Sequence, residues 1–275
     1  MIKKGGTMVR KTCVAGYFYP KQKESLIEMI KGFIDPDMKK IKALGAISPH
    51  AGYQYSGIVA GAVFASIRIP DRLVLLGPSH RTMNSNFAII REGEWETPFG
   101  NISIDTKLAD QIISSTKLVS EDMDAHRMEH SLEVQLPFIH YFNPNCSIVP
   151  LITTYFASYN DLEELGKSIS SSIKKLDEDV LILASTDMSH QVSQDTAKEK
   201  DFLAIDKISN LDPRGLYDVV KQQRISMCGF QATTAALVAA KELGAKKAEL
   251  IKYQTSGDVT EDYNNVVGYA GMRIV

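Results

Sequence analysis

Three histidines follow continuous apolar runs of the sequence, and their side chains are the first candidates for chemistry. His50, His80 and His190 are each separated from such a run by a few small or turn-forming residues, and Asp187 lies just before the last of them. Imidazole titrates near neutral pH, so it can bind a metal or move a proton. A single histidine of this kind is usually a hydrogen-bonded loop residue, but the same placement three times favours a shared site.

A cysteine adds a soft donor to this set. Cys228 comes directly before a predicted helix, where the positive end of the helix dipole favours a thiolate. Two imidazoles and a thiolate suit copper, iron or zinc, whereas magnesium and calcium prefer oxygen ligands. The alternative is a small buried residue at the start of a helix. Cys13 and Cys146 are interpreted as structural.

The densest group of ionisable side chains lies around His126. His126, Glu129 and His130 match an inverted zinc-protease motif, in which two histidines one helical turn apart bind zinc and the glutamate acts as base. On a continuous helix, Glu133 would share a face with both histidines. So short a motif also occurs by chance, and two other interpretations stay open: a helix start that hydrogen-bonds the sheet edge, or side chains that face a substrate.

Other polar residues near these motifs could complete a pocket. Tyr53 and Tyr55 follow His50 and could line its mouth, although Tyr55 could equally introduce the next helix. Arg81 could contact an anion or pair with a nearby acid. Asp258 could orient a histidine or a substrate hydroxyl, but its Ser-Gly-Asp context is also ordinary turn chemistry.

The composition excludes several classes of protein. The 275 residues include 31 basic and 33 acidic side chains with no long block of either sign, so we expect neither nucleic acid nor membrane as partner. No apolar run approaches the roughly 20 residues that span a bilayer, and the first residues lack the apolar segment of a signal peptide. Three scattered cysteines do not form a disulfide framework. We therefore expect a cytoplasmic protein.

The apolar pattern predicts a single α/β domain over residues 1–275, with a loose segment over 1–12. Runs that are apolar on both faces suit strands of a mostly parallel central sheet flanked by helices, and ligands bind beyond the carboxyl ends of such strands. An antiparallel excursion is expected over 87–104. Strands are predicted over 42–49, 73–77, 146–153, 179–185, 248–253 and 266–272, and helices over 25–33, 56–67, 107–115, 124–142, 162–173, 197–208, 213–220 and 230–243.

Taken together, the motifs closely resemble the Memo family. The blocks that carry the resemblance follow one another along nearly the whole chain, which makes it specific. They are AGYFYP at 15–20, PHAGYQYSG at 49–57, LGPSH at 76–80, EHSLEVQLPF at 129–138, STDMSH at 185–190 and GD at 257–258.

The resemblance implies a fold similar to the class III extradiol ring-cleaving dioxygenases, in which two histidines and a glutamate hold ferrous iron and another histidine is the acid and base. By this resemblance His50 and His80 are metal ligands, and His190 is the acid-base group beside Asp187. Cys228 takes the place of the carboxylate, which breaks the usual facial triad of non-haem iron oxygenases and favours softer metals. Memo relatives are associated with copper or iron and with redox effects.

The resemblance also bears on partners. Animal members are associated with phosphotyrosine-bearing partners, a role that we do not carry over, and prokaryotic relatives are often encoded beside a radical-SAM protein, which suggests a functional partner of that kind. We expect a metal-dependent redox or dioxygenase-like activity on an unknown small molecule. The alternatives are a non-catalytic scaffold that uses the cleft for a peptide or protein, and a metal-assisted hydrolase. An oligomer stays open.

Overall fold

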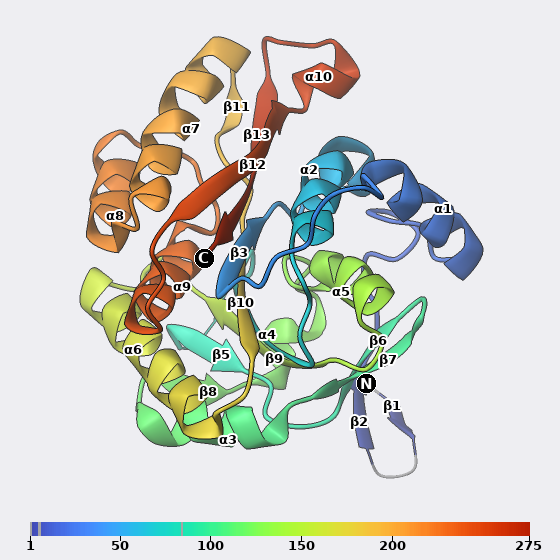
Figure 1. Cartoon of the computed structure of the whole chain (residues 1–275), viewed down its shortest axis with the longest axis vertical. Coiled ribbons are helices and arrows are strands. Elements are labelled where there is room, and N and C mark those ends of the chain that lie inside the picture. Colours follow the sequence, from blue (N-terminus) through green and yellow to red (C-terminus); the bar gives the residue numbers. More distant parts are fainter. Residues whose placement is uncertain (1, 5–6, 84) are drawn as a thin grey trace.

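The structure, a computed structural model, describes residues 2–4, 7–83 and 85–275 (Figure 1). Strands and helices alternate along most of the chain, as the apolar pattern predicts. The strands are β1 (Ile2–Lys4), β2 (Thr7–Arg10), β3 (Gly45–Ser48), β4 (Arg72–Pro78), β5 (Phe87–Ile89), β6 (Glu94–Thr97), β7 (Gly100–Ile104), β8 (Val119–Glu121), β9 (Ser147–Thr153), β10 (Val180–Ser185), β11 (His190–Val192), β12 (Ala248–Thr255) and β13 (Val266–Ile274). The helices are α1 (Lys23–Phe33), α2 (Tyr53–Ser66), α3 (Thr106–Ser115), α4 (Met123–Arg127), a 3-10 turn at Glu133–Gln135, α5 (Leu136–Phe142), α6 (Tyr159–Leu176), α7 (Gln194–Ser209), α8 (Pro213–Gln222), α9 (Phe230–Glu242) and α10 (Gly257–Thr260).

The strands form one large mixed sheet. Its order is β1-β2-β6-β7-β9-β4-β10-β3-β13-β11, with β12 paired to β13, and β5 to β8 and β9. The central strands β9, β4, β10 and β3 are parallel to one another, whereas β13 runs antiparallel to β3. The predicted α/β class with a mostly parallel central sheet is therefore confirmed, and the carboxyl ends of β3, β10 and β4 lie next to one another.

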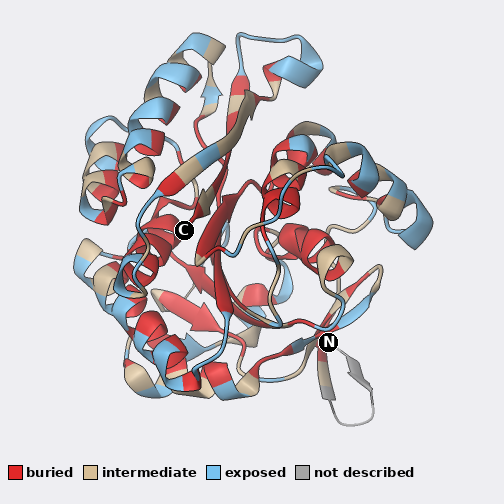
Figure 2. Ribbon diagram, in the orientation of Figure 1, coloured by how far each residue is buried: buried red, intermediate tan, exposed pale blue. Residues whose placement is uncertain are grey.

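Two layers of helices cover the sheet, because its central strands are apolar on both faces. Successive residues alternate between the layers: in β10, Ile182 and Ala184 belong to the core cluster that includes residues of α6 and α9, while Leu181 and Leu183 belong to the cluster that includes residues of α1, α2 and α5. Figure 2 shows buried strands throughout the centre and exposed outer faces on the helices. In the part of the chain that the structure describes, none of these helices combines the length and apolar character needed to cross a membrane.

The N-terminal segment differs from the prediction. A loose segment is expected over 1–12, but the structure forms strands at Ile2–Lys4 and Thr7–Arg10; residues 1, 5 and 6 lie outside the described residues. The strand β2 pairs with β6, and Arg10 is buried at 1% exposure. Its guanidinium binds the Glu133 carboxylate and donates to the backbone oxygens of His126 and Glu129. Arg10 is therefore buried because Glu133, far away in the sequence, binds it, and the sequence around Arg10 gives no sign of this partner.

The predicted long helix over 124–142 is also wrong. The helix α4 ends at Arg127, and the chain resumes a helical path only at Glu133. The Glu129 carboxylate interrupts the helix, since it accepts hydrogen bonds from the backbone of Ser131 at 2.8 Å and of His80 at 2.7 Å. The interruption brings Glu129 and His130 to the carboxyl edge of the sheet.

Candidate metal centre

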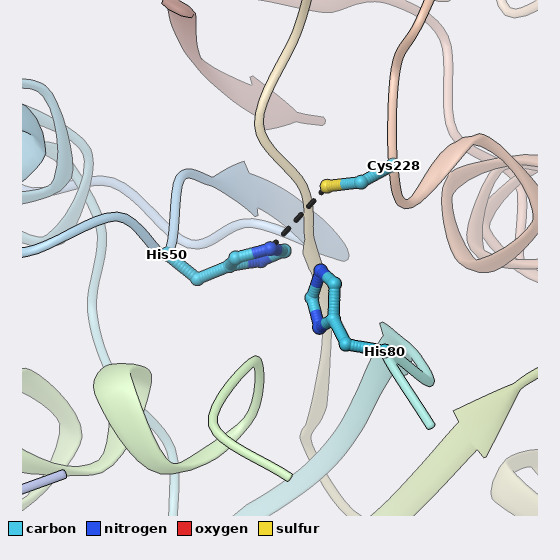
Figure 3. Close-up of side chains that lie close together, drawn as sticks. All are labelled: His50, His80 and Cys228. Atoms are coloured by element: carbon cyan, nitrogen blue, oxygen red, sulfur yellow. Dashed lines mark hydrogen bonds between the residues drawn. The ribbon is translucent and has the colours of Figure 1, made fainter. Parts of the chain in front are cut away.

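Three donor side chains from distant segments meet at the carboxyl edge of the central strands. His50 follows β3, His80 follows β4, and Cys228 lies just before α9; one ligand atom of each lies within 4.8 Å of the other two. Figure 3 shows the three side chains converging, with the Cys228 sulfur 3.3 Å from Nε2 of His50. The predicted gathering of these residues at one edge is confirmed.

The hydrogen bonds of His50 leave its Nε2 free to bind. Its Nδ1 lies 2.9 Å from the Ser185 hydroxyl, which donates its own hydrogen to the Ser131 carbonyl at 2.6 Å. A hydroxyl has one hydrogen to give, so Nδ1 must carry the proton and donate to Ser185. Burial lowers the pKa of His50 to about 3, which keeps the ring neutral. Its Nε2 therefore presents a lone pair toward Cys228.

His80 is oriented by a carboxylate. Its Nδ1 donates to Oε1 of Glu129 at 2.9 Å, so its Nε2 is the nitrogen available for a ligand. Burial opposes protonation of His80, but the hydrogen bond and charge of Glu129 outweigh it and raise the pKa of the imidazole. Burial likewise opposes ionisation of Glu129, yet the bonds from His80 and Ser131 keep the pKa of that carboxyl well below its usual range.

The protonation state of Cys228 differs from the thiolate that its place before a helix predicts. Burial and the nearby Asp187 carboxylate raise the pKa of Cys228 far above its usual value, so the thiol stays protonated until a cation replaces the proton. The predicted effect of the helix dipole does not prevail. A close approach fixes the position of this cysteine: a Cβ on Gly229 would lie 2.4 Å from the Ser185 carbonyl oxygen, so only glycine lets the segment approach β10 so closely.

A cavity of about 570 Å³ opens beside these donors, lined among others by His50, His80, Asp187 and His190. The Nδ1 of His190 lies 2.9 Å from the Ser226 carbonyl, which can only accept, so Nε2 of His190 is left as an acceptor. The buried Asp187 accepts from the His50 backbone at 2.8 Å, and burial raises the pKa of its carboxyl. A proton acceptor and a buried acid thus share a cavity with the donor atoms.

The remaining predicted pocket residues divide into two groups. Tyr55 and His130 line the cavity, and the His130 ring stacks on that of His80 with centroids 4.4 Å apart. Burial lowers the pKa of His130 to about 4. Tyr53 instead belongs to the core, where its hydroxyl donates to the Val134 carbonyl at 2.7 Å.

Two other candidates lie away from the cavity lining. Arg81 is exposed and donates to the Met128 carbonyl at 3.2 Å. Asp258 is exposed and accepts from the Thr255 backbone at 2.7 Å, which is the turn chemistry that its sequence context allows.

The inverted zinc-protease arrangement is not formed. His126 is fully buried, and its Nε2 donates to the Ala88 carbonyl at 3.0 Å rather than facing His130. Glu133 is buried with Arg10 and also accepts from the backbone of Cys13 and the hydroxyl of Tyr19. Burial alone would raise the pKa of Glu133, but Arg10 and these donors lower it. His126 and Glu133 therefore serve the packing of the N-terminal segment.

Sequence reasoning assigned no role to two serines that orient the histidines. Ser185 fixes the proton of His50, and the Ser226 carbonyl fixes that of His190. The position of Ser185 at the end of β10, beside β3, was a usable signal because parallel strand ends meet at one edge. Ser226 carries no such signal, since its carbonyl reaches His190 only through the tertiary fold.

Comparison with known proteins agrees with these motifs. The model of the family described as Memo-like protein matches residues 10–273. A MEMO1 family protein of Methanothermobacter thermautotrophicus is 38% identical over 277 residues, covering 96% of this chain and 99% of that protein. A MEMO1 family protein of Aquifex aeolicus is 40% identical over 268 residues, with 96% and 98% covered.

A solved structure supports the fold. The crystal structure of an uncharacterized protein from Escherichia coli K12 aligns with a TM-score of 0.56 and covers 83% of this chain and 99% of that one. At 11% identity this likeness concerns the fold alone. The match of the family model over nearly all of the sequence, together with the relatives at 38% and 40% identity, shows that this chain belongs to the Memo family.

Proposed function

We propose that the protein binds copper or iron through Nε2 of His50, Nε2 of His80 and the sulfur of Cys228, and that it carries out redox or dioxygenase-like chemistry on a small substrate. The observation that carries this proposal is the convergence of the three donor atoms within 4.8 Å, with the Nδ1 atom of each imidazole already committed to a protein acceptor. The protein thus supplies the tautomers that metal binding requires.

The donor set suits a soft or borderline metal. Two imidazoles and a thiolate favour copper over the hard cations, and the thiolate replaces the carboxylate of the usual iron facial triad. When bound, the metal would supply electron transfer and polarise an oxygen of the substrate. Zinc fits the same donors but would supply only polarisation.

The chain's own residues would handle the substrate and its protons. Tyr55 and Tyr269 line the cavity and offer contacts to an aromatic ring, while His190 Nε2 would accept a proton from a substrate hydroxyl and later return it. Asp187 would hold the loop after β3 in place through the His50 backbone. A cavity of about 570 Å³ accommodates a small molecule.

Anaerobic titration with copper(I) and iron(II), followed by elemental analysis, tests the metal site. The parent should bind one equivalent, and Cys228→Ser and His80→Ala should each weaken binding at least a hundredfold. Cys13→Ser is the matched control, because Cys13 lies with Arg10 and Glu133 and outside the donor set. Loss of binding in the control but not in Cys228→Ser would contradict the assignment.

Failure of the parent to bind any metal would refute the proposal. The search would then turn to a peptide or protein partner for the same cavity, including a radical-SAM protein.

A further inference from the structure

A second cavity, also of about 570 Å³, adjoins the first through the segment Ser226–Cys228. Cys228 lines this cavity, while its sulfur lies 3.3 Å from His50, a lining residue of the first cavity. No residue is common to the two linings. The second cavity is therefore a separate space that shares a wall with the donor set.

The cavity joins an apolar floor to a cationic rim. Val220, Ile225 and Met227 are buried and form the floor, and Lys221 and Arg224 stand exposed at the rim. There is no carboxylate among its lining residues.

The protein positions one of the two cations through its side chain. The Lys221 ammonium donates to the Tyr217 hydroxyl at 2.7 Å, and the backbone of Arg224 adopts a left-handed conformation with φ 50° two residues after α8. The nearby Asp218 is bound by Arg214, and among the described residues neither Lys221 nor Arg224 forms an ion pair. Two neighbouring cations without a carboxylate partner favour an anion.

Tyr155 provides a flat apolar wall. Its side chain is 65% exposed, its ring meets that of Phe230 edge to face, and its carbonyl accepts from the Gln231 amide at 2.7 Å. An exposed ring beside a buried floor and two cations is complementary to a molecule with an aromatic part and an anionic end.

We propose that this cavity binds a small amphipathic anion, a carboxylate or phosphate that carries a flat apolar group. The anionic end lies between Lys221 and Arg224, and the apolar part lies against Tyr155 and Met227. The occupant contacts the segment whose Ser226 carbonyl orients His190. Binding of this anion does not depend on a metal, so the proposal can be tested independently of the proposed function.

Methyl NMR of the full chain, as purified and labelled at methionine, tests the proposal. The Met227 resonance, assigned with Met227→Leu, should shift on titration with millimolar benzoate or phenyl phosphate and not with benzylamine, which carries the same ring on a cation. If the Met227 resonance shifts with only one of the two anions, that anionic group is the type of ligand that the cavity binds. If it shifts with both, the negative charge is the feature that the cavity recognises.

Variants sharpen the test. Lys221→Gln and Arg224→Gln should each weaken binding of the anion about tenfold, because each removes one charge-assisted contact. Lys31→Gln is the matched control, since this exposed lysine lies on α1 in the other helical layer, and it should bind as the parent does. An unshifted Met227 resonance with both anions, an equal shift with benzylamine, or unchanged affinity in both rim variants would overturn the proposal.

Discussion

Replacing Glu129 with glutamine tests how the protein prepares His80 for a metal. Glu129 accepts from Nδ1 and the backbone of His80 at 2.9 and 2.7 Å and from the Ser131 backbone at 2.8 Å. Glutamine has one acceptor oxygen, so its amide group would face an N–H donor and the negative charge would be lost. Loss of such a carboxylate partner costs about 10- to 100-fold in metal affinity, or about 1.4 to 2.7 kcal/mol.

The size of this loss should depend on pH. In the parent, the charge of Glu129 raises the pKa of His80, so a proton competes with the metal at Nε2 below that pKa. The glutamine variant lacks this charge, and its His80 gives up the proton more easily. The full loss of metal affinity is therefore expected at pH 8. The difference in metal affinity between parent and variant should become smaller as the pH falls toward 6.

Both the loss of affinity and its pH dependence can be measured by competition with a chromophoric copper(I) chelator. The titrations are done under anaerobic reducing conditions at pH 6, 7 and 8. Glu121→Gln is the matched control, because this exposed carboxylate of β8 lies outside the donor set, and it should bind as the parent does. Equal affinity of Glu129→Gln and parent at pH 8, or a gap that widens in acid, would refute the reasoning.

Three further changes test the surroundings of the site. Gly229→Ala should lower copper affinity at least tenfold in the same titration, because its Cβ would meet the Ser185 carbonyl and displace the neighbouring cysteine. Glu133→Gln should reduce the free energy of unfolding in urea by about 3 to 5 kcal/mol, since Arg10 would be left buried without its anion. The folded-state pKa of Glu133 is lowered, so its contribution to stability is fully present above the unfolded pKa near 4.3. The free energies of unfolding of parent and variant should therefore become more alike as the pH falls below that value. His190→Gln should keep its copper and lose turnover of any substrate by about 10²- to 10⁴-fold, and lower metal content would show a ligand role instead.

The sequence was sufficient to predict the edge where the site lies. His50 and His80 follow runs apolar on both faces, and such runs form neighbouring parallel strands whose carboxyl ends meet. Cys228 follows no strand, so its place in the set rested on its donor chemistry, on its position before a predicted helix and on the family resemblance. The local rule for parallel strands thus accounts for two of the three donors.

The break in the helix over 124–142 could not be predicted from periodicity. The apolar spacing continues through the segment, but the Glu129 carboxylate accepts from the backbone of Ser131 and of His80, and the His80 backbone is available only after β4 has folded beside it. Arg10 and Glu133 present the same difficulty, because 123 residues separate them. Such long-range polar contacts are decided by tertiary structure and leave no periodic signal.

The state of the Cys228 thiol depends on the size of two opposing effects. A helix dipole favours an anion at the N-terminus of α9 by about 0.3 to 1 kcal/mol, less than one pKa unit. Burial can raise a pKa by several units, and the charge of Asp187 adds to it, so burial prevails. His50 is ready to bind at neutral pH, whereas Cys228 must first lose a proton. Metal affinity is therefore limited by a proton that the cation itself displaces, which favours a metal whose bond to sulfur is strong enough to offset that cost.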